Sequence, residues 1–419
     1  MRLFRSKILL LLLWGALTLF IGVQIHTSLR HRIITLPRDA DELAWFYHAD
    51  FFRLLVQGNI SDPYWQSLEA YDHPPLTKYI YGAYLQITSP QFTHDRTQFR
   101  RTYGSWYDGN IDIFPYDHPA FMQYVHNMRE LNIVFALATL TVAALLLWHL
   151  TGNILLSLGF AGWLGHIGSL QVILIRAVSD VQYLLFFLCA LLAFVLYLKK
   201  QHTWLLILSS ALGALSFSSK LIGGIYFLIV PVFFLLETCI RKKQATQNFI
   251  SVLIVMFVGG LLWVVLNPTL YPSPITNSLY YLKMRDSILL YQTHEPHNSP
   301  AILVSVSQRM GYLSCTFFHT PFHKPCADWY LFPLWYVNAA LFLLGVYTLA
   351  IRTIKQKNRV ALFALTALVV IIILSAWKLQ FAWERYLVTH LSIVSAVTFL
   401  GIHAVFRTLK SQFSKHGKV

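Results

Sequence analysis

The sequence predicts an all-α protein that crosses a membrane many times. Three observations point to this class: 56% of the 419 residues are hydrophobic and only 12% are charged, and the mean hydropathy is +0.53. Soluble domains use about twice that share of charged residues. The net charge of +15 could indicate a nucleic-acid partner. The placement of the basic residues, described below, favours a membrane protein, and we expect no nucleic acid.

Ten segments are apolar over a length near that needed to cross a bilayer as a helix. They lie at about 8–26, 130–150, 152–174, 181–198, 203–219, 221–240, 248–266, 330–351, 360–377 and 386–406. The first follows the basic start MRLFRSK, as in a signal peptide, but no small-x-small cleavage pattern follows it. We therefore expect an uncleaved anchor helix. With no soluble domain visible, we expect residues 1–419 to form a single transmembrane domain.

The charges predict the topology. If the N-terminus is cytoplasmic, the cytoplasmic pieces hold sixteen lysines and arginines and one acid, Glu237, while the other seventeen acids fall on the opposite side. Short basic loops are typical of the cytoplasmic side. We therefore expect an integral membrane protein with both termini in the cytoplasm and two large external segments at about 27–129 and 267–329; the prokaryotic cell (inner) membrane is implied only by the resemblance given below.

The first external segment holds most of the acids and many aromatic residues, and we expect it to carry amphipathic helices. The stretch 43–57 mixes aromatic and polar residues in a spacing compatible with a helix on the membrane surface. In YDHPPLTKYIYG (71–82), Pro75 can begin a helix that carries Lys78 towards the membrane.

Two motifs in this segment are candidate functional groups. The neighbouring carboxylates Asp41 and Glu42 could supply a general base or bind a cation, or could be a solvated loop pair or a helix N-cap. His73 and Lys78 could face an anionic group together, or form a rigid turn with a lysine whose ammonium reaches out to water.

Further charges stand at the ends of predicted spans. Arg129 opens the second span. Arg176 and Asp180 could form an i,i+4 ion pair, or the arginine could neutralise a lipid phosphate. Lys220 lies between two apolar stretches with no acid nearby in the sequence, which favours anion binding. Arg385, before the last span, is ambiguous in the same way.

The second external segment contains C-x3-H-x3-H-x2-C, formed by Cys315, His319, His323 and Cys326. Zinc takes four such ligands, but this spacing matches no standard zinc module. An external compartment permits disulfides. We expect a Cys315–Cys326 disulfide, with free thiols and then zinc as the alternatives.

Taken in order, these motifs resemble the protein O-mannosyltransferases and their bacterial relatives, including the aminoarabinose transferases that modify lipid A. Those enzymes are polyprenyl-phosphate-sugar transferases of the GT-C fold. The resemblance rests on Asp41–Glu42, HPPLTK (73–78), Arg129, IRAVSDVQYLLFF (175–187), FSSKLIGG (217–224), LNPTLYPSP (266–274) and ERYL (384–387). Thr77 stands where the family has glycine.

The resemblance implies roles for four of these residues. Asp41 would activate the acceptor hydroxyl as a base, and Glu42 would support the geometry of the site. Arg129 and Lys220 would bind the phosphate of the donor. No cofactor is predicted; a divalent metal beside the carboxylates is possible, but no full ligand set is visible.

The remaining site residues would surround the same pocket. By the same resemblance, His73 and Lys78 would shape it, and Asp180 falls where the family has a functional acid after an arginine, here Arg176. Arg385 would be a further substrate-binding cation.

The function implied is transfer of a hexose or pentose from a polyprenyl-phosphate donor to a hydroxyl of a protein, lipid or glycan, on the extracytoplasmic face and with inversion. Two alternatives stay open. A transporter or flippase for an anionic lipid would also need cations in the membrane. A non-catalytic relative is the other, and Thr77 is compatible with it.

Overall fold

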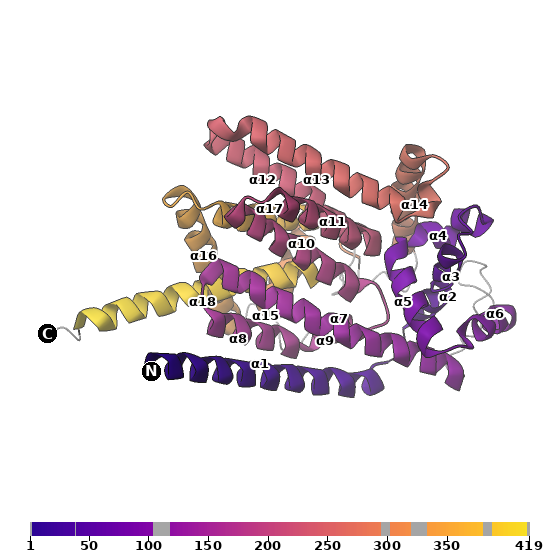
Figure 1. The fold of residues 1–419 in the computed structure, drawn as a ribbon, viewed down its shortest axis with the longest axis horizontal. Helices are drawn as coiled ribbons and strands as arrows, with labels where there is room; N and C mark the ends of the chain where they lie inside the picture. Colours follow the sequence, from indigo (N-terminus) through magenta and orange to yellow (C-terminus); the bar gives the residue numbers. More distant parts are fainter. Residues whose placement is uncertain are drawn as a thin grey trace.

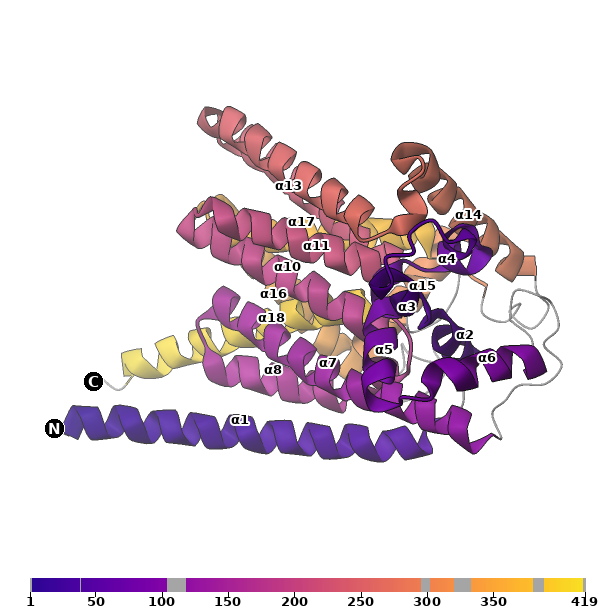
Figure 2. The same ribbon diagram turned by 45° about the vertical axis from the view of Figure 1, so that its right-hand side comes forward.

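A computed structural model describes residues 2–37, 39–103, 118–294, 302–319, 333–379 and 388–416. Long helices lie side by side along the molecule, and shorter helices gather at one end of them (Figure 1). Both chain termini lie at the other end, so we name the two ends the terminal end and the short-helix end. Figure 2 shows the same arrangement from a second direction.

The bundle is formed by α1 (Arg2–Thr35), α7 (Pro119–Thr151), α8 (Ile154–His166), α9 (Gly168–Ile175), α10 (Asp180–Lys200), α11 (Thr203–Ser219), α12 (Tyr226–Ile240), α13 (Ala245–Val265), α16 (Pro333–Ile354), α17 (Arg359–Lys378) and α18 (Val388–His416). The short-helix end carries α2 (Ala40–His48), α3 (Phe51–Val56), α4 (Leu68–Asp72), α5 (Pro75–Thr88), α6 (Phe92–Tyr103), α14 (Pro274–His294) and α15 (Val306–His319). Short 3-10 turns link several helices: η1 (Pro63–Gln66), η4 (Leu221–Ile225), η5 (Lys242–Gln244) and η6 (Pro268–Leu270).

The predicted all-α membrane architecture is confirmed. Within the described residues, seven helices are long and apolar enough to cross a membrane, and the pair α8–α9, bent by 76°, makes an eighth if it is one span. The shorter apolar helix α11 coincides with the predicted segment 203–219. The segment at 8–26 lies within α1. As far as the structure describes them, each of the ten predicted segments therefore falls on helical structure.

Apolar packing explains the bundle. One continuous cluster of buried hydrophobic side chains joins α1, α7, α8, α10, α11, α12, α17 and α18. Large apolar side chains on the outer helices, such as Phe249 and Phe257 of α13, stay exposed. Exposed apolar belts of this kind suit a hydrocarbon solvent.

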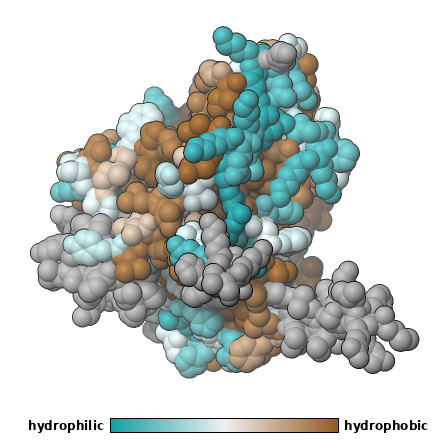
Figure 3. All heavy atoms as spheres, turned by 90° about the vertical axis from the view of Figure 1, so that its left-hand side faces the viewer, coloured by the Kyte–Doolittle hydropathy of each residue, from teal (hydrophilic) through white to brown (hydrophobic). Residues whose placement is uncertain are grey.

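At the terminal end, hydrophilic residues gather in bands beside apolar ones (Figure 3). The connections at this end hold Lys199–Lys200, Arg241–Lys242 and the 352–359 turn. A buried ion pair lies next to these connections. The guanidinium of Arg359 contacts the fully buried carboxylate of Glu237. The lone acid among the predicted basic loops is thereby neutralised within the protein.

The stretch 43–57 does not form a surface helix. It divides into α2 and α3 at Ala49–Asp50, and Trp45, Phe46 and Phe51 are fully buried in the protein. These aromatic side chains pack against α5, α6 and α7 in two apolar clusters. The expectation of a membrane-surface helix was therefore wrong, because tertiary contacts cover its apolar residues.

Candidate functional site

The candidate site is built around the turn that joins α9 to α10, residues 176–180, at the short-helix end. The helix α9 stops because Arg176 takes extended backbone angles (φ −56°, ψ 137°), and α10 begins at Asp180. Because the backbone is not helical between them, Arg176 and Asp180 cannot stack as an i,i+4 pair. Each finds a partner from a distant part of the chain.

The two charges of this turn belong to two separate ion pairs. Arg176 Nη1 lies 2.6 Å from Asp39 Oδ2, with both side chains about one fifth exposed. Lys220 Nζ lies 2.5 Å from Asp180 Oδ1, and Asp180 is almost fully buried. The alternative of an Arg176–Asp180 ion pair was therefore wrong. The sequence around Lys220 contains no acid and suggested an unpaired lysine. In the structure, Lys220 is paired with Asp180.

Polar groups from three helices fix the position of this turn. The Asn132 amide of α7 donates to the Arg176 carbonyl at 2.6 Å. The Tyr81 hydroxyl of α5 donates to the Val178 carbonyl at 2.9 Å. Gln182 donates to the Asn132 side-chain oxygen at 2.7 Å. Since these groups are fully buried, each lost partner would leave a costly unsatisfied dipole, which holds the turn rigidly.

Glu42 and Arg129 form the anchor beneath the turn. The Arg129 guanidinium donates to both Glu42 oxygens: Nε lies 2.8 Å from Oε1, and Nη2 lies 2.6 Å from Oε2. Its remaining N–H groups donate to the carbonyls of Ile33, Leu36 and Pro37. Glu42 also accepts from the Ala177 backbone N–H at 2.9 Å, which ties the anchor to the turn.

This geometry does not fit the donor-phosphate role expected for Arg129. Five hydrogen bonds use the five N–H groups that an arginine has. Its side chain is only 1% exposed. A guanidinium that is buried and fully bonded has nothing left for a substrate, so we assign Arg129 to the support of Glu42 and of the turn.

Asp41 lies in the first turn of α2, half-buried. Its backbone N–H donates to the side chain of the N-cap residue Asp39 at 2.9 Å. One helical turn further on, Trp45 lies on the same face and its ring contacts those of His73 and Tyr81. Asp41 therefore stands beside the Asp39–Arg176 pair, on the face of α2 that points towards α5.

Lys220 ends α11 and begins the turn into α12. Its ammonium lies 5.5 Å from the centre of the Tyr183 ring, which offers a favourable cation–π contact. The side chain is 13% exposed, whereas its partner Asp180 is 2% exposed. Lys220 and Arg176 thus combine a carboxylate partner with an edge that solvent reaches.

His73 and Lys78 belong to a second cluster, between α4, α5 and α14. His73 Nδ1 lies 2.7 Å from Asp72 Oδ2, and Arg285 of α14 lies 2.8 Å from the other oxygen. Burial lowers the pKa of His73, although Asp72 opposes the shift. Burial also acts to raise the pKa of Asp72, but His73 and Arg285 outweigh it and hold that pKa well below its usual range.

The ammonium of Lys78 is buried within the protein. As predicted, α5 begins at Pro75. Its Lys78, however, is 1% exposed and donates to the carbonyls of Glu69 and Ala70, at 2.6 and 3.2 Å. Its ammonium also lies 4.7 Å from the centre of the Phe51 ring. Burial lowers the pKa of Lys78 to about 7, against the pull of Asp72 and Glu69. The alternative of a lysine that reaches out to water was therefore wrong, because Lys78 caps the C-terminal end of α4.

Two predicted elements fall wholly or partly outside the described residues. Arg385 lies outside them. Cys315 is disulfide-bonded, but Cys326 lies outside the described part of the chain, so the Cys315–Cys326 pairing stays a prediction. Among the described residues, no group of three or more His, Cys, Asp or Glu side chains is placed to hold a metal ion.

No protein-family model matches the chain, and no curated protein matches it. Solved structures do. An archaeal oligosaccharyltransferase, AglB from Archaeoglobus fulgidus, in complex with an inhibitory peptide and a dolichol-phosphate, superimposes with a TM-score of 0.55 at 11% identity, over 96% of this chain and 52% of that one.

The chain has the GT-C fold. Two further structures of the Archaeoglobus fulgidus oligosaccharyltransferase agree. The apo form gives a TM-score of 0.51 over 96% of this chain and 52% of that one, and the complex with Zn and sulfate gives 0.52 over 93% and 49%, each at 11% identity. This chain spans about half the length of the enzymes it matches.

Three charged residues of these two clusters were not predicted from the sequence. Asp39 binds Arg176, and Asp72 joins His73 to Arg285. Asp39 stands two positions before a noted acidic pair, and Asp72 directly precedes a noted histidine, so proximity to a motif was an available signal. Arg285 had none, because its partner is 213 positions away.

Proposed function

We propose that this chain is a glycosyltransferase of the GT-C class that transfers a sugar from a polyprenyl-phosphate donor to an acceptor hydroxyl. The observation that carries the proposal is the turn at 176–180. It brings two cations, Arg176 and Lys220, and the acids Asp39 and Asp180 to one end of a membrane bundle, beside Asp41. Such a transfer requires a base for the acceptor and cations for the leaving phosphate.

In the proposed reaction, Asp41 accepts the proton of the acceptor hydroxyl. The hydroxyl oxygen then attacks the anomeric carbon, and the bond from that carbon to the phosphate oxygen breaks in the same displacement. The electron pair leaves with the polyprenyl phosphate, and the configuration at the anomeric carbon inverts.

Arg176 and Lys220 would stabilise the negative charge that grows on the leaving phosphate. Each is held in place by a carboxylate, Asp39 or Asp180, and each keeps an exposed edge. Glu42 and Arg129 would not contact the substrate themselves; they would position the turn that carries Arg176. This differs from the role that the family resemblance implied for Arg129, which was to bind the donor phosphate.

The nature of the donor is proposed by analogy. The AglB structure with the same fold holds a dolichol-phosphate and a peptide. We propose a polyprenyl-phosphate hexose or pentose as the donor of this chain, and a protein, lipid or glycan hydroxyl as the acceptor. The site would face the extracytoplasmic side of a prokaryotic inner membrane, with both termini in the cytoplasm.

Transfer of radiolabelled sugar from a panel of polyprenyl-phosphate donors tests the proposal, with purified wild type beside Asp41→Asn. We expect wild-type transfer and a loss of about 10²–10⁴-fold in kcat in the variant, the range typical of a lost general base. Asp286→Asn, which removes an exposed carboxylate on α14, is the matched control and should keep full activity.

The possible outcomes distinguish the role of Asp41 from the class of enzyme. Full activity in a folded Asp41→Asn protein would remove Asp41 as the base and leave the transferase. No transfer from any donor by folded wild type would contradict the transferase itself. Transport assays on the same preparation would then decide for a lipid transporter.

A further inference from the structure

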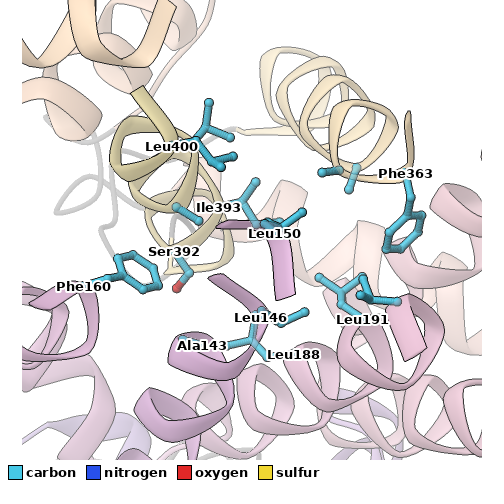
Figure 4. Close-up of a pocket in the computed structure, with 15 residues that line it drawn as sticks. Ala143, Leu146, Leu150, Phe160, Leu188, Leu191, Phe363, Ser392, Ile393 and Leu400 are labelled. Atoms are coloured by element: carbon cyan, nitrogen blue, oxygen red, sulfur yellow. The ribbon is translucent and has the colours of Figure 1, made fainter. Parts of the chain in front are cut away.

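The helix α18 leaves the bundle at the terminal end. Within the bundle its side chains are packed, and Ile393 and Leu400 line the interior together with Leu150 of α7 (Figure 4). His403 is the last buried side chain that the structure describes on α18. From 405 to 412 every residue is exposed. This part of the helix, which we name the protruding segment, extends past its neighbours (Figures 1 and 2).

The protruding segment has one apolar and one basic face. At about 100° per residue, Val405, Phe406 and Leu409 fall within one arc of about 100°, and all three are exposed. Arg407 lies on the opposite side of the helix, and Lys410 lies at the border between the two faces. A helix with large apolar residues on one face and Lys or Arg on the other is typical of a membrane interface.

The length of α18 brings this segment to the edge of the bilayer. The first turn of α18 lies beside the candidate site, because the Thr389 hydroxyl lies 2.9 Å from that of Tyr183. The whole helix has 29 residues, which is about 43 Å at 1.5 Å per residue. The hydrocarbon core of a bilayer is about 30 Å thick. The protruding segment therefore reaches the headgroup layer on the far side from the site.

The composition of the segment also excludes the two simpler placements. In water, Val405, Phe406 and Leu409 would stay exposed and lose the benefit of burial. In hydrocarbon, the charges of Arg407 and Lys410 would lose their hydration, which is costly. At the interface the apolar face contacts acyl chains while the two cations reach the headgroups.

Further positive charge surrounds the start of the segment. Arg352 lies in the last turn of α16 and donates to a carbonyl at the end of α7 at 2.7 Å. The charges of Arg352 and Arg407 act on each other and on His403. Glu237, the one acid among the basic connections of this end, is already paired with Arg359. Cations that repel one another are stabilised by an anion between them, and a guanidinium suits a phosphate.

We propose that the protruding segment lies in the headgroup layer and binds anionic phospholipids. Its apolar face would contact the acyl chains, and Arg407, Lys410 and Arg352 would bind the lipid phosphates. A zwitterionic headgroup carries its own ammonium, so a lipid with net negative charge is favoured. The proposal does not depend on sugar transfer, because none of these residues belongs to the candidate site.

Spin labels on the two faces of the segment test this placement. In a Cys239→Ser background, the label is attached to Leu409→Cys on the apolar face or to Ser411→Cys on the polar face. The full chain is placed in nanodiscs of phosphatidylcholine, with or without phosphatidylglycerol. Cys239→Ser alone gives the background signal.

With phosphatidylglycerol, we expect the label at position 409 to collide mainly with oxygen, which is soluble in lipid. The label at position 411 should collide mainly with a water-soluble nickel chelate. Without phosphatidylglycerol, position 409 should become accessible to the chelate. If both labels are equally accessible to the chelate in both lipids, the segment projects into water and the proposal is overturned. Access of oxygen alone to both labels would place the segment in hydrocarbon and overturn it as well.

A matched pair of variants tests the role of charge. Arg407→Gln with Lys410→Gln removes two cations of the segment. Arg101→Gln with Lys283→Gln removes two exposed cations at the short-helix end. In the first variant, the phosphatidylglycerol content that produces half of the change at position 409 should rise at least about fivefold, the effect of one lost surface cation. The second variant should respond like the parent protein. Equal responses of the two variants would contradict an anionic-lipid site.

A protein partner is a distinguishable outcome. If position 409 is shielded from the chelate in native membranes but not in nanodiscs that contain phosphatidylglycerol, the apolar face binds a protein and the lipid proposal is overturned. All four substituted cations except Arg352, which is retained, are exposed, and unfolding midpoints in detergent confirm that each variant is folded.

Discussion

At the residue scale, the Glu42–Arg129 pair shows how burial decides the role of a charge. Each side chain is 1% exposed, and the guanidinium is fully bonded within the protein. Taking two charges out of water is costly, and only good geometry with further hydrogen bonds offsets the cost. Removal of one partner leaves the other charge buried and alone, so this pair is expected to be more sensitive to substitution than an exposed one.

Arg129→Leu should therefore lower the free energy of unfolding by about 3–5 kcal/mol, as for other broken buried pairs. The double variant Glu42→Leu with Arg129→Leu should recover part of the loss, because no unpaired charge remains. Thermal unfolding in detergent measures both. If Arg129→Leu instead unfolds like wild type and loses only donor affinity, Arg129 binds the donor after all and our reassignment is wrong.

Lys78 predicts a dependence of stability on pH. Its pKa is about 7 in the folded protein and near 10.5 when unfolded. Between these values the unfolded chain binds the extra proton, so the contribution of Lys78 to stability rises as the pH increases from about 7 to 10. Below pH 7 both states are protonated and the full penalty of the buried charge remains.

The comparison of Lys78→Met with wild type isolates this effect from other titrating groups. The stability of wild type relative to Lys78→Met should increase steadily between pH 7 and pH 10. Unfolding midpoints of the two proteins in detergent measure this difference. A difference that stays constant over this range would show that the lysine keeps its ordinary pKa in the folded state.

At the element scale, the close approach of α16 and α18 depends on two glycines. A Cβ on Gly345 would collide with the Val397 carbonyl, and one on Gly401 with the Leu341 carbonyl. Small residues at such crossings let membrane helices pack backbone to backbone. Since α18 carries Thr389, whose hydroxyl lies 2.9 Å from that of Tyr183, this crossing also helps to position the ring beside Lys220.

Gly401→Leu should separate the two helices and cost about 1–3 kcal/mol, as overpacking commonly does. Gly260→Leu on α13 is the matched control, because no atom lies near the position that its Cβ would occupy. Unfolding midpoints in detergent compare the two. Equal stability of the two variants would mean that α16 and α18 do not approach as closely as described.

At the scale of the whole molecule, the bundle separates two chemistries. Acids and cations of the candidate site lie at the short-helix end, and basic connections lie at the end with both termini (Figure 1). An ion has a much lower energy in water than in hydrocarbon, so charged groups collect at the two ends of a membrane bundle. The positive charge of the connections at the terminal end is the charge expected of a cytoplasmic face.

This separation predicts opposite accessibility for two engineered cysteines. In a Cys239→Ser background, Lys200→Cys at the end of α10 should react with a membrane-impermeant maleimide only after the cells are opened. Thr102→Cys on α6 should react on intact cells. Both positions are exposed. Labelling of both from the same side would contradict the membrane topology.

The class of fold, the helical segments and the separation of charges can be predicted from the amino-acid sequence. Apolar length and the placement of lysines and arginines are local properties, and the bilayer converts them directly into spans and sides. The sequence also identified Asp41, Arg176, Asp180 and Lys220 as residues of one neighbourhood, because the motifs resemble those of a known family in the same order.

The pairing of the charged residues and their accessibility depend on the three-dimensional fold. Arg176 binds Asp39 and not Asp180, Lys220 binds Asp180, and Arg129 is fully bonded to Glu42 and nearby carbonyls. The partners are up to 137 positions apart (Arg176 to Asp39) and depend on how the turn at 176–180 leaves the helix. Pairing in a low-dielectric interior is set by distance and burial, and neither can be read from the order of residues along the chain.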